Sequence, residues 1–142
     1  MWPLATTKPK HLLPIAGRPM ISILITTLAA AGIKELSVVV GFKGELIQSL
    51  LGDGTKFGLS IEYLRQPKWT GTASAVEVAR QSVGDEPFLA IYGDLLVSQS
   101  CIHILSSLLL QETQDDACFE KSLHPVAFRT LAVENTEPRR RK

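Results

Sequence analysis

The first residue whose place in the sequence suggests chemistry is the carboxylate at position 94. Asp94 and the glycine before it, Gly93, directly follow a strand of buried type that we predict over Phe88–Tyr92. Ligands of open parallel sheets bind beyond the carboxyl ends of the strands. A carboxylate there can hold a divalent metal, and a glycine lets a ligand approach the backbone closely. An aspartate that only caps the next turn explains this position equally well.

A second group of candidates lies one predicted strand earlier in the chain. Thr72 follows Gly71 and can cap a helix, whose first N–H groups would then face the same rim as Asp94. Gln66 carries a donor and an acceptor on one side-chain amide, which suits the edge of a nucleobase. From spacing alone, an ordinary capped helix is the simpler explanation of these residues.

The third candidate is Lys10, which lies beside Pro9 in a proline-rich segment. A lysine held in a loop at a nucleotide site can neutralise phosphate charge as it develops. A lysine in a polar loop is usually only solvated, so Lys10 needs support from other residues.

These candidates need a scaffold, and the hydrophobic periodicity predicts alternating strands and helices. Residues 1–19 contain four prolines and predict a loop. The predicted helices are 20–32, Glu45–Leu51, Thr72–Ser82 and Ile102–Leu110, and the predicted strands are Leu36–Val40, Ser60–Leu64, Phe88–Tyr92 and Val126–Val133. Gly32 is expected to cap the first helix. The alternation predicts an α/β fold with an open, mostly parallel sheet and helices on both faces.

The composition indicates one soluble domain. The chain has 142 residues, of which 45% are hydrophobic and 20% charged, and its formal net charge is +1. Such a balance gives no field that would attract nucleic acid or a membrane surface. The longest apolar stretch is too short to span ~30 Å of hydrocarbon, and the first residues lack the apolar region of a signal peptide. We therefore expect a cytoplasmic protein with no nucleic-acid or membrane partner.

The two cysteines, Cys101 and Cys118, fit no zinc-binding spacing. Two separate thiols, the usual state in the cytosol, and a disulfide between them both remain open.

Four ordered segments resemble the signature of the sugar-1-phosphate nucleotidyltransferases. This family includes glucose-1-phosphate thymidylyltransferases and N-acetylglucosamine-1-phosphate uridylyltransferases. The segments are residues 2–20, which contain Lys-Pro-Lys-His-Leu-Leu-Pro-Ile-Ala-Gly-Arg-Pro-Met, then 51–58, 66–75 and 92–94. Four motifs in the expected order are more specific than any one of them.

The resemblance implies a role for each candidate. Lys10 would contact phosphate and stabilise the charge of the transition state, and Asp94 would be one of two carboxylates that bind Mg²⁺. The residues implied for the nucleotide are Gln66, Gly71, Thr72, Tyr92 and Gly93. The first three would hold the base, and the last two would line the nucleoside and sugar pocket.

The implied partners are a nucleoside triphosphate (UTP or dTTP) and a sugar-1-phosphate. A sugar-phosphate oxygen would attack the α-phosphorus, giving a nucleotide sugar and pyrophosphate. A non-catalytic relative that binds nucleotide sugars or regulates a partner subunit is the alternative.

The chain departs from the family pattern at both ends. The family's first strand and its Gly-x-Gly-Thr-Arg loop would precede residue 2, and the second metal carboxylate would follow Asn135. Arg129 stands where the family has glycine. We therefore expect a fragment that does not catalyse alone, with an incomplete Rossmann-like three-layer sandwich over 1–135 and a basic, disordered tail over 136–142. The missing strand predicts exposed backbone edges, apolar surface on the helix 20–32, and poor solubility or homo-oligomers.

Overall fold

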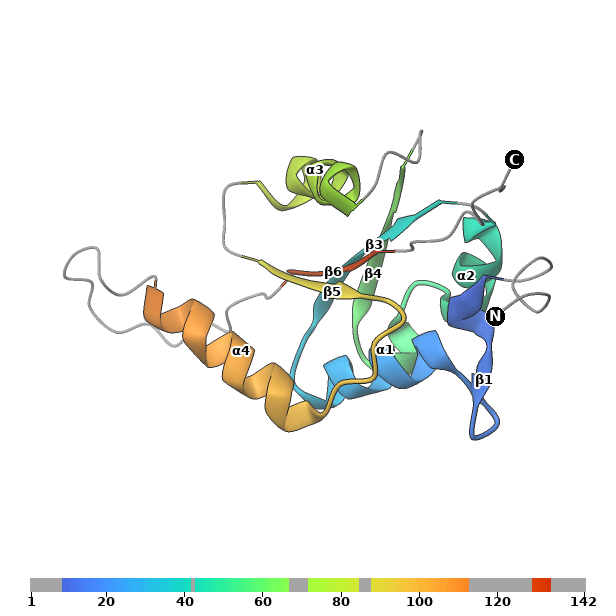
Figure 1. The fold of residues 1–142 in the computed structure, drawn as a ribbon, viewed down its shortest axis with the longest axis horizontal. Coiled ribbons are helices and arrows are strands. Elements are labelled where there is room, and N and C mark those ends of the chain that lie inside the picture. Colours follow the sequence, from blue (N-terminus) through green and yellow to red (C-terminus); the bar gives the residue numbers. More distant parts are fainter. Residues whose placement is uncertain (1–8, 42, 67–71, 85–87, 113–128, 134–142) are drawn as a thin grey trace, which may run out of the picture.

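A four-stranded, wholly parallel sheet forms the centre of the described structure (Figure 1). The computed structural model describes residues 9–41, 43–66, 72–84, 88–112 and 129–133. The strands are β3 (Glu35–Val40), β4 (Ser60–Arg65), β5 (Leu89–Tyr92) and β6 (Arg129–Val133). Their order in the sheet is β4-β3-β6-β5. The register places Glu35 opposite Ser60 on one side and opposite Arg129 on the other.

Strand β3 is covered on both faces, as its run of valines predicts. All five residues from Leu36 to Val40 are buried. Branched side chains pack well on both sides of a pleated strand that two layers cover. Successive residues of β3 therefore supply two separate cores.

Helices cover both faces of the sheet, which confirms the predicted three layers. The helices are α1 (Met20–Ala30), α2 (Gly44–Leu51), α3 (Thr72–Val83) and α4 (Gln99–Glu112). The larger core joins Leu36, Val38 and Val40 to apolar residues of α1, α2 and α4. The smaller core joins Val39 to Ala75 and Ala79 of α3. Figure 1 shows α3 on one side of the sheet and α1 with α4 on the other.

Helix α1 ends at the glycine that the sequence predicts as its cap. Gly32 has φ +90°. Its N–H donates to the carbonyl of Ala29 (3.0 Å), and the N–H of Ile33 donates to the carbonyl of Leu28 (3.1 Å). This pair of hydrogen bonds is the Schellman motif, which needs a left-handed residue.

The segment before α1 has more structure than the predicted loop. Its described part, residues 9–19, contains a 3₁₀ turn, η2 (Lys10–Leu12), and a hairpin of two-residue strands, β1 (Pro14–Ile15) and β2 (Arg18–Pro19). Strands this short leave no periodic pattern, so the sequence does not reveal them. The N–H of Met20 donates to the carbonyl of Leu13 (3.1 Å), which ties η2 to the start of α1.

Strand β6 occupies the centre of the sheet and pairs with both β3 and β5. It confirms the end of the strand predicted over Val126–Val133, whose first three residues lie outside the described part, as does the tail 136–142.

The prediction that the helix 20–32 exposes apolar surface is wrong. None of the large apolar residues of α1, all of which the structure describes, is exposed: Ile21, Leu24, Ile25 and Leu28 are at most 2% exposed, and Met20 and Ile23 are half-buried. These side chains pack in the larger core together with residues of the sheet and with Ile102 of α4. Poor solubility stays a prediction.

Helix α4 begins three residues before its predicted start. The hydroxyl of Ser98 accepts a hydrogen bond from the N–H of Cys101 (3.2 Å) and so caps the helix. Cys101 is exposed on α4, and Cys118 lies outside the described residues. No helix in the described part of the chain is long and apolar enough to cross a membrane.

Candidate functional site

The carboxyl ends of the parallel strands form the edge at which the sequence predicts a site. The helix that joins β3 to β4, α2, contributes to the larger core, whereas α3, which joins β4 to β5, covers the opposite face. Such a change of face is a topological switch point, where open α/β sheets bind their ligands. Gly41, Gln66 and Gly93 are the first residues after β3, β4 and β5.

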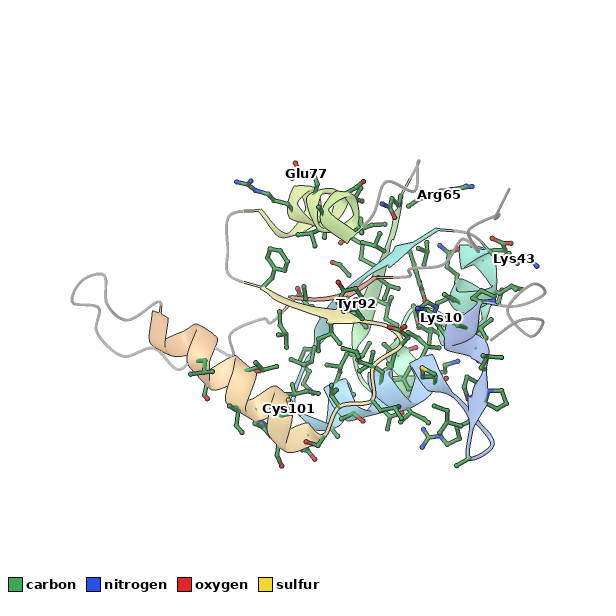
Figure 2. The ribbon with its side chains drawn as sticks, in the orientation of Figure 1. Lys10, Lys43, Arg65, Glu77, Tyr92 and Cys101 are labelled. Atoms are coloured by element: carbon green, nitrogen blue, oxygen red, sulfur yellow. The ribbon has the colours of Figure 1, made fainter. Side chains whose placement is uncertain are left out.

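Lys10 and Asp94 form an ion pair at this edge. The Lys10 Nζ lies 2.5 Å from Oδ2 of Asp94, and the two side chains are 20% and 29% exposed. The residues are 84 positions apart in the chain. Lys10 belongs to η2, and Figure 2 shows it reaching the end of β5 from the N-terminal segment. Two of the three candidate groups therefore meet in one place.

The surroundings of Asp94 favour its ionised form. Partial burial is the largest single influence and raises the pKa of this carboxyl. The hydrogen bond and the charge of Lys10, together with a smaller contribution from His11, lower it further than burial raises it. The net result is a pKa below the ordinary value, so Asp94 carries a negative charge at neutral pH.

The ring of His11 is buried near the ion pair, against Gly93. Its side chain is 1% exposed. Burial, followed by the charge of Lys10, lowers the pKa of His11 to about 4, although Asp94 acts in the opposite direction. The imidazole is therefore neutral at physiological pH. No role was expected for this histidine from sequence, since it fits no metal or triad spacing.

Gly93 contacts His11 on the side where a side chain would stand. A Cβ added to Gly93 would lie 3.0 Å from Cδ2 of His11 and 3.3 Å from Cδ1 of Ile21. The missing side chain therefore makes room for protein atoms. That Gly93 also lines a nucleoside pocket stays a prediction.

The remaining predicted residues lie on other elements of the same edge or outside the described part. Gln66 is 7% exposed, and its backbone N–H donates to the carbonyl of Val40 (3.1 Å). Tyr92 is 42% exposed and points to the face opposite Ile91, because side chains alternate along a strand. Thr72 is the first residue of α3, but its side chain and Gly71 are not among the described residues.

Further basic residues follow the strand ends. Arg65 is the last residue of β4, and Lys43 immediately precedes α2 with φ +56°. A left-handed conformation costs a residue other than glycine about 1–2 kcal/mol. Sequence reasoning missed Lys43; its position between a predicted strand and helix was the available signal. Arg65 and Lys43 therefore add basic side chains near the carboxyl ends of β4 and β3.

The described residues fit a metal ion only if a ligand shares in holding it. Among them, no group of three or more His, Cys, Asp and Glu side chains lies close enough to bind a metal. Mg²⁺ is commonly held by one or two carboxylates, waters and the phosphates of a substrate. Asp94 meets that requirement as a single, partly exposed carboxylate.

The chain matches a known family over most of its length. The model of the nucleotidyl transferase family matches residues 1–121. A low-salt glycan biosynthesis nucleotidyltransferase from Haloferax volcanii is 38% identical over 106 residues, which cover 74% of this chain and 30% of that protein. An N-acetylmuramate alpha-1-phosphate uridylyltransferase from Neisseria meningitidis is 37% identical over 97 residues, covering 68% and 42%.

Solved structures agree with the fold. A crystal structure from Bacillus anthracis, provisionally named a glucose-1-phosphate thymidylyltransferase, has a TM-score of 0.69 and 28% identity, and the match covers 78% of this chain and 45% of that one. A UDP-glucose pyrophosphorylase without ligand gives a TM-score of 0.64 at 23% identity, with coverage of 80% and 50%. The chain thus spans about a third of its curated relatives and half of these structures.

Proposed function

Because this chain belongs to the nucleotidyl transferase family, we propose that its carboxyl edge binds a nucleoside triphosphate, whose nucleotidyl group is transferred to a sugar-1-phosphate. The nucleotide is UTP or dTTP, and the products are a nucleotide sugar and pyrophosphate. The observation that carries the proposal is the Lys10–Asp94 pair, which places a cation and a carboxylate at the switch point of the sheet. The cytoplasm is the expected place of this reaction.

Each member of the pair has a separate task. Lys10 has three N–H donors, so it can contact a phosphate oxygen while it keeps its bond to Asp94. It would neutralise charge that develops on the phosphates during transfer. Asp94, ionised at neutral pH, would be the protein's ligand for Mg²⁺. When bound, that ion polarises the phosphate oxygens and orients the triphosphate.

Gln66 and the start of α3 are proposed to hold the base. The backbone of Gln66 is fixed to β3 through the carbonyl of Val40, which limits where its amide can point. Gly71 and Thr72 follow it across a short connection to α3. Tyr92 and Gly93 complete the proposed set on the side of the nucleoside and sugar.

Nucleotide binding by the purified chain tests this function. Titration calorimetry with UTP and dTTP, in Mg²⁺ and in EDTA, should give binding that Lys10→Met weakens about 10–100-fold, since a hydrogen bond to a charged group contributes about 1.5–3 kcal/mol. Asp94→Asn should remove the difference between Mg²⁺ and EDTA. Matched controls at the far end of the sheet are Lys34→Met and Glu62→Gln. They should change neither the affinity for nucleotide nor its difference between Mg²⁺ and EDTA.

Two results would contradict the proposal. One is wild-type protein that binds neither triphosphate, and the other is weakening by the control variants as large as that by Lys10→Met. If the nucleotide binds, a pyrophosphate-release assay with sugar-1-phosphates shows whether this chain also transfers the nucleotidyl group. Release that Lys10→Met abolishes supports transfer by this chain, whereas binding without release is expected both of a fragment that lacks part of the site and of the non-catalytic alternative.

A further inference from the structure

The contact between His11 and Gly93 lies beside the Lys10–Asp94 pair and joins the same two segments. His11 follows Lys10 in η2, and Gly93 precedes Asp94 after β5. An added Cβ at Gly93 would come within 3.0 Å of Cδ2 and 3.4 Å of Nε2 of the ring. The ring therefore occupies the space that any larger residue at position 93 would need.

This contact leaves little freedom for either segment. The ring is 1% exposed, and Cδ1 of Ile21 stands 3.3 Å from the same added atom. Ile21 is itself 2% exposed and belongs to α1, to which η2 is tied through Met20 and Leu13. Close-packed interiors transmit small shifts, because atoms have no empty space into which they can move. A displacement of the ring would therefore displace the backbone of residue 93.

We propose that His11 is a positioning residue, whose ring, seated against Gly93, fixes the distance between the amine of Lys10 and the carboxylate of Asp94. The inference rests on the proposed function of that pair. A side chain at this place has to fill space without adding charge, since a cation would repel Lys10 and compete with it for Asp94. The imidazole of His11, which is buried and is neutral at physiological pH, meets both conditions.

An ordinary core residue would behave differently. Removal of its ring would lower the free energy of unfolding but leave the geometry of folded molecules unchanged. A positioning residue changes the ion pair in molecules that remain folded. A measurement on the Lys10–Asp94 pair itself therefore distinguishes a positioning residue from an ordinary core residue.

The test is a double-mutant cycle of His11→Ala, Gly93→Ala and the double variant. The first readout is the ¹³C chemical shift of the Asp94 carboxyl carbon at neutral pH without nucleotide, with Lys10→Met as the reference for a lost pair. The second is the Kd for UTP and dTTP in Mg²⁺. Controls are His103→Ala, an exposed histidine of α4, and Gly54→Ala, a crowded glycine in the loop before β4.

Both single variants should move the carboxyl shift toward the Lys10→Met value. They should weaken nucleotide binding about 10-fold for Gly93→Ala and about 3–10-fold for His11→Ala. In the double variant the new methyl group takes up space that the ring leaves, so binding should return to within about 3-fold of wild type. The controls should leave the shift unchanged, including the one that lowers stability.

Single-variant effects that simply multiply in the double variant would overturn the proposal, as would a carboxyl shift that His11→Ala leaves at the wild-type value. If Gly93→Ala does not fold, the carboxyl shift of Asp94 in His11→Ala still decides whether His11 positions the pair. If wild-type protein binds no nucleotide, the function proposed above fails. The shift then shows independently whether His11 positions the pair.

Discussion

The two ends of the parallel sheet both gather polar side chains, but they arrange charge in opposite ways. At the carboxyl edge, a lysine and an aspartate from distant parts of the chain meet at 2.5 Å. At the amino edge, the carboxylates of Glu35 and Glu62 line a cavity of about 230 Å³ together with serines. The hydroxyl of Ser82 donates to Glu62, and that of Ser37 lies 3.5 Å from it.

The carboxyl edge is thus a site that the fold assembles, whereas the amino edge is a polar surface that solvent reaches. Hydroxyl groups of Ser37 and Ser82 surround the Glu62 carboxylate, and such groups together with water solvate a charge at a surface. A close pair of opposite charges from distant parts of the chain needs tertiary structure to hold it. The comparison therefore predicts that changes at the carboxyl edge affect binding, whereas changes at the amino edge affect stability or nothing.

The largest effect is expected from a glycine beside the amino edge. Gly54 has φ +90°, and a Cβ there would lie 2.7 Å from the carbonyl oxygen and Cδ1 of Leu59. Gly54→Ala should lower the free energy of unfolding by about 2–5 kcal/mol, the sum of left-handed strain and overpacking. Urea denaturation measures this loss, and folded protein should keep its affinity for nucleotide.

Gly58 provides the matched control for Gly54. It lies in the same loop with φ +78°, and nothing stands within 4 Å of an added Cβ. Gly58→Ala should therefore cost only the conformational strain, about 1–2 kcal/mol. Equal losses in the two variants would show that the crowding around Gly54 is unimportant.

Exchanging the two charges of the carboxyl edge sharpens the comparison. The double variant Lys10→Asp, Asp94→Lys keeps opposite charges at the pair, so its stability should stay within about 1 kcal/mol of wild type, as for other partly exposed pairs. Nucleotide affinity should fall about 10–100-fold, because the cation no longer projects from η2. Calorimetry and urea denaturation on the same protein measure both quantities. Full affinity in the exchanged protein would mean that the pair serves only the fold.

Local patterns in the sequence predicted the scaffold well. The valine run of β3 and the glycine cap of α1 depend on neighbouring residues, which the sequence shows directly. Lys10 and Asp94 were also found as candidates, each from its own motif. Their contact was not predictable by periodicity, because it depends on how η2 and β5 meet across 84 positions.

What the sequence missed depends on tertiary packing. His11 lies in a proline-rich segment that predicts a loop, and only the folded structure shows that its ring is buried against Gly93. The central place of β6 is a second example. Its residues predict a strand but do not predict which strands it pairs with, since strand order is a property of the whole sheet.

The smallest effect is expected at Asp53, beside Gly54 and far from the ion pair in sequence. Its carboxylate accepts hydrogen bonds from the hydroxyl (2.6 Å) and the backbone N–H (3.1 Å) of Thr55, and these lower the pKa of Asp53. A lowered pKa in the folded state stabilises the protein above the ordinary pKa, and this contribution is lost as the pH falls through the lower value. Thr55→Val removes the hydroxyl, the larger cause, so the pKa of Asp53 should rise toward its ordinary value, as measured by ¹³C NMR titration. Thr55→Ser, which keeps the hydroxyl, should leave it low. If both variants titrate like wild type, the hydroxyl does not set this pKa, and the backbone N–H of Thr55 is the more important of the two donors.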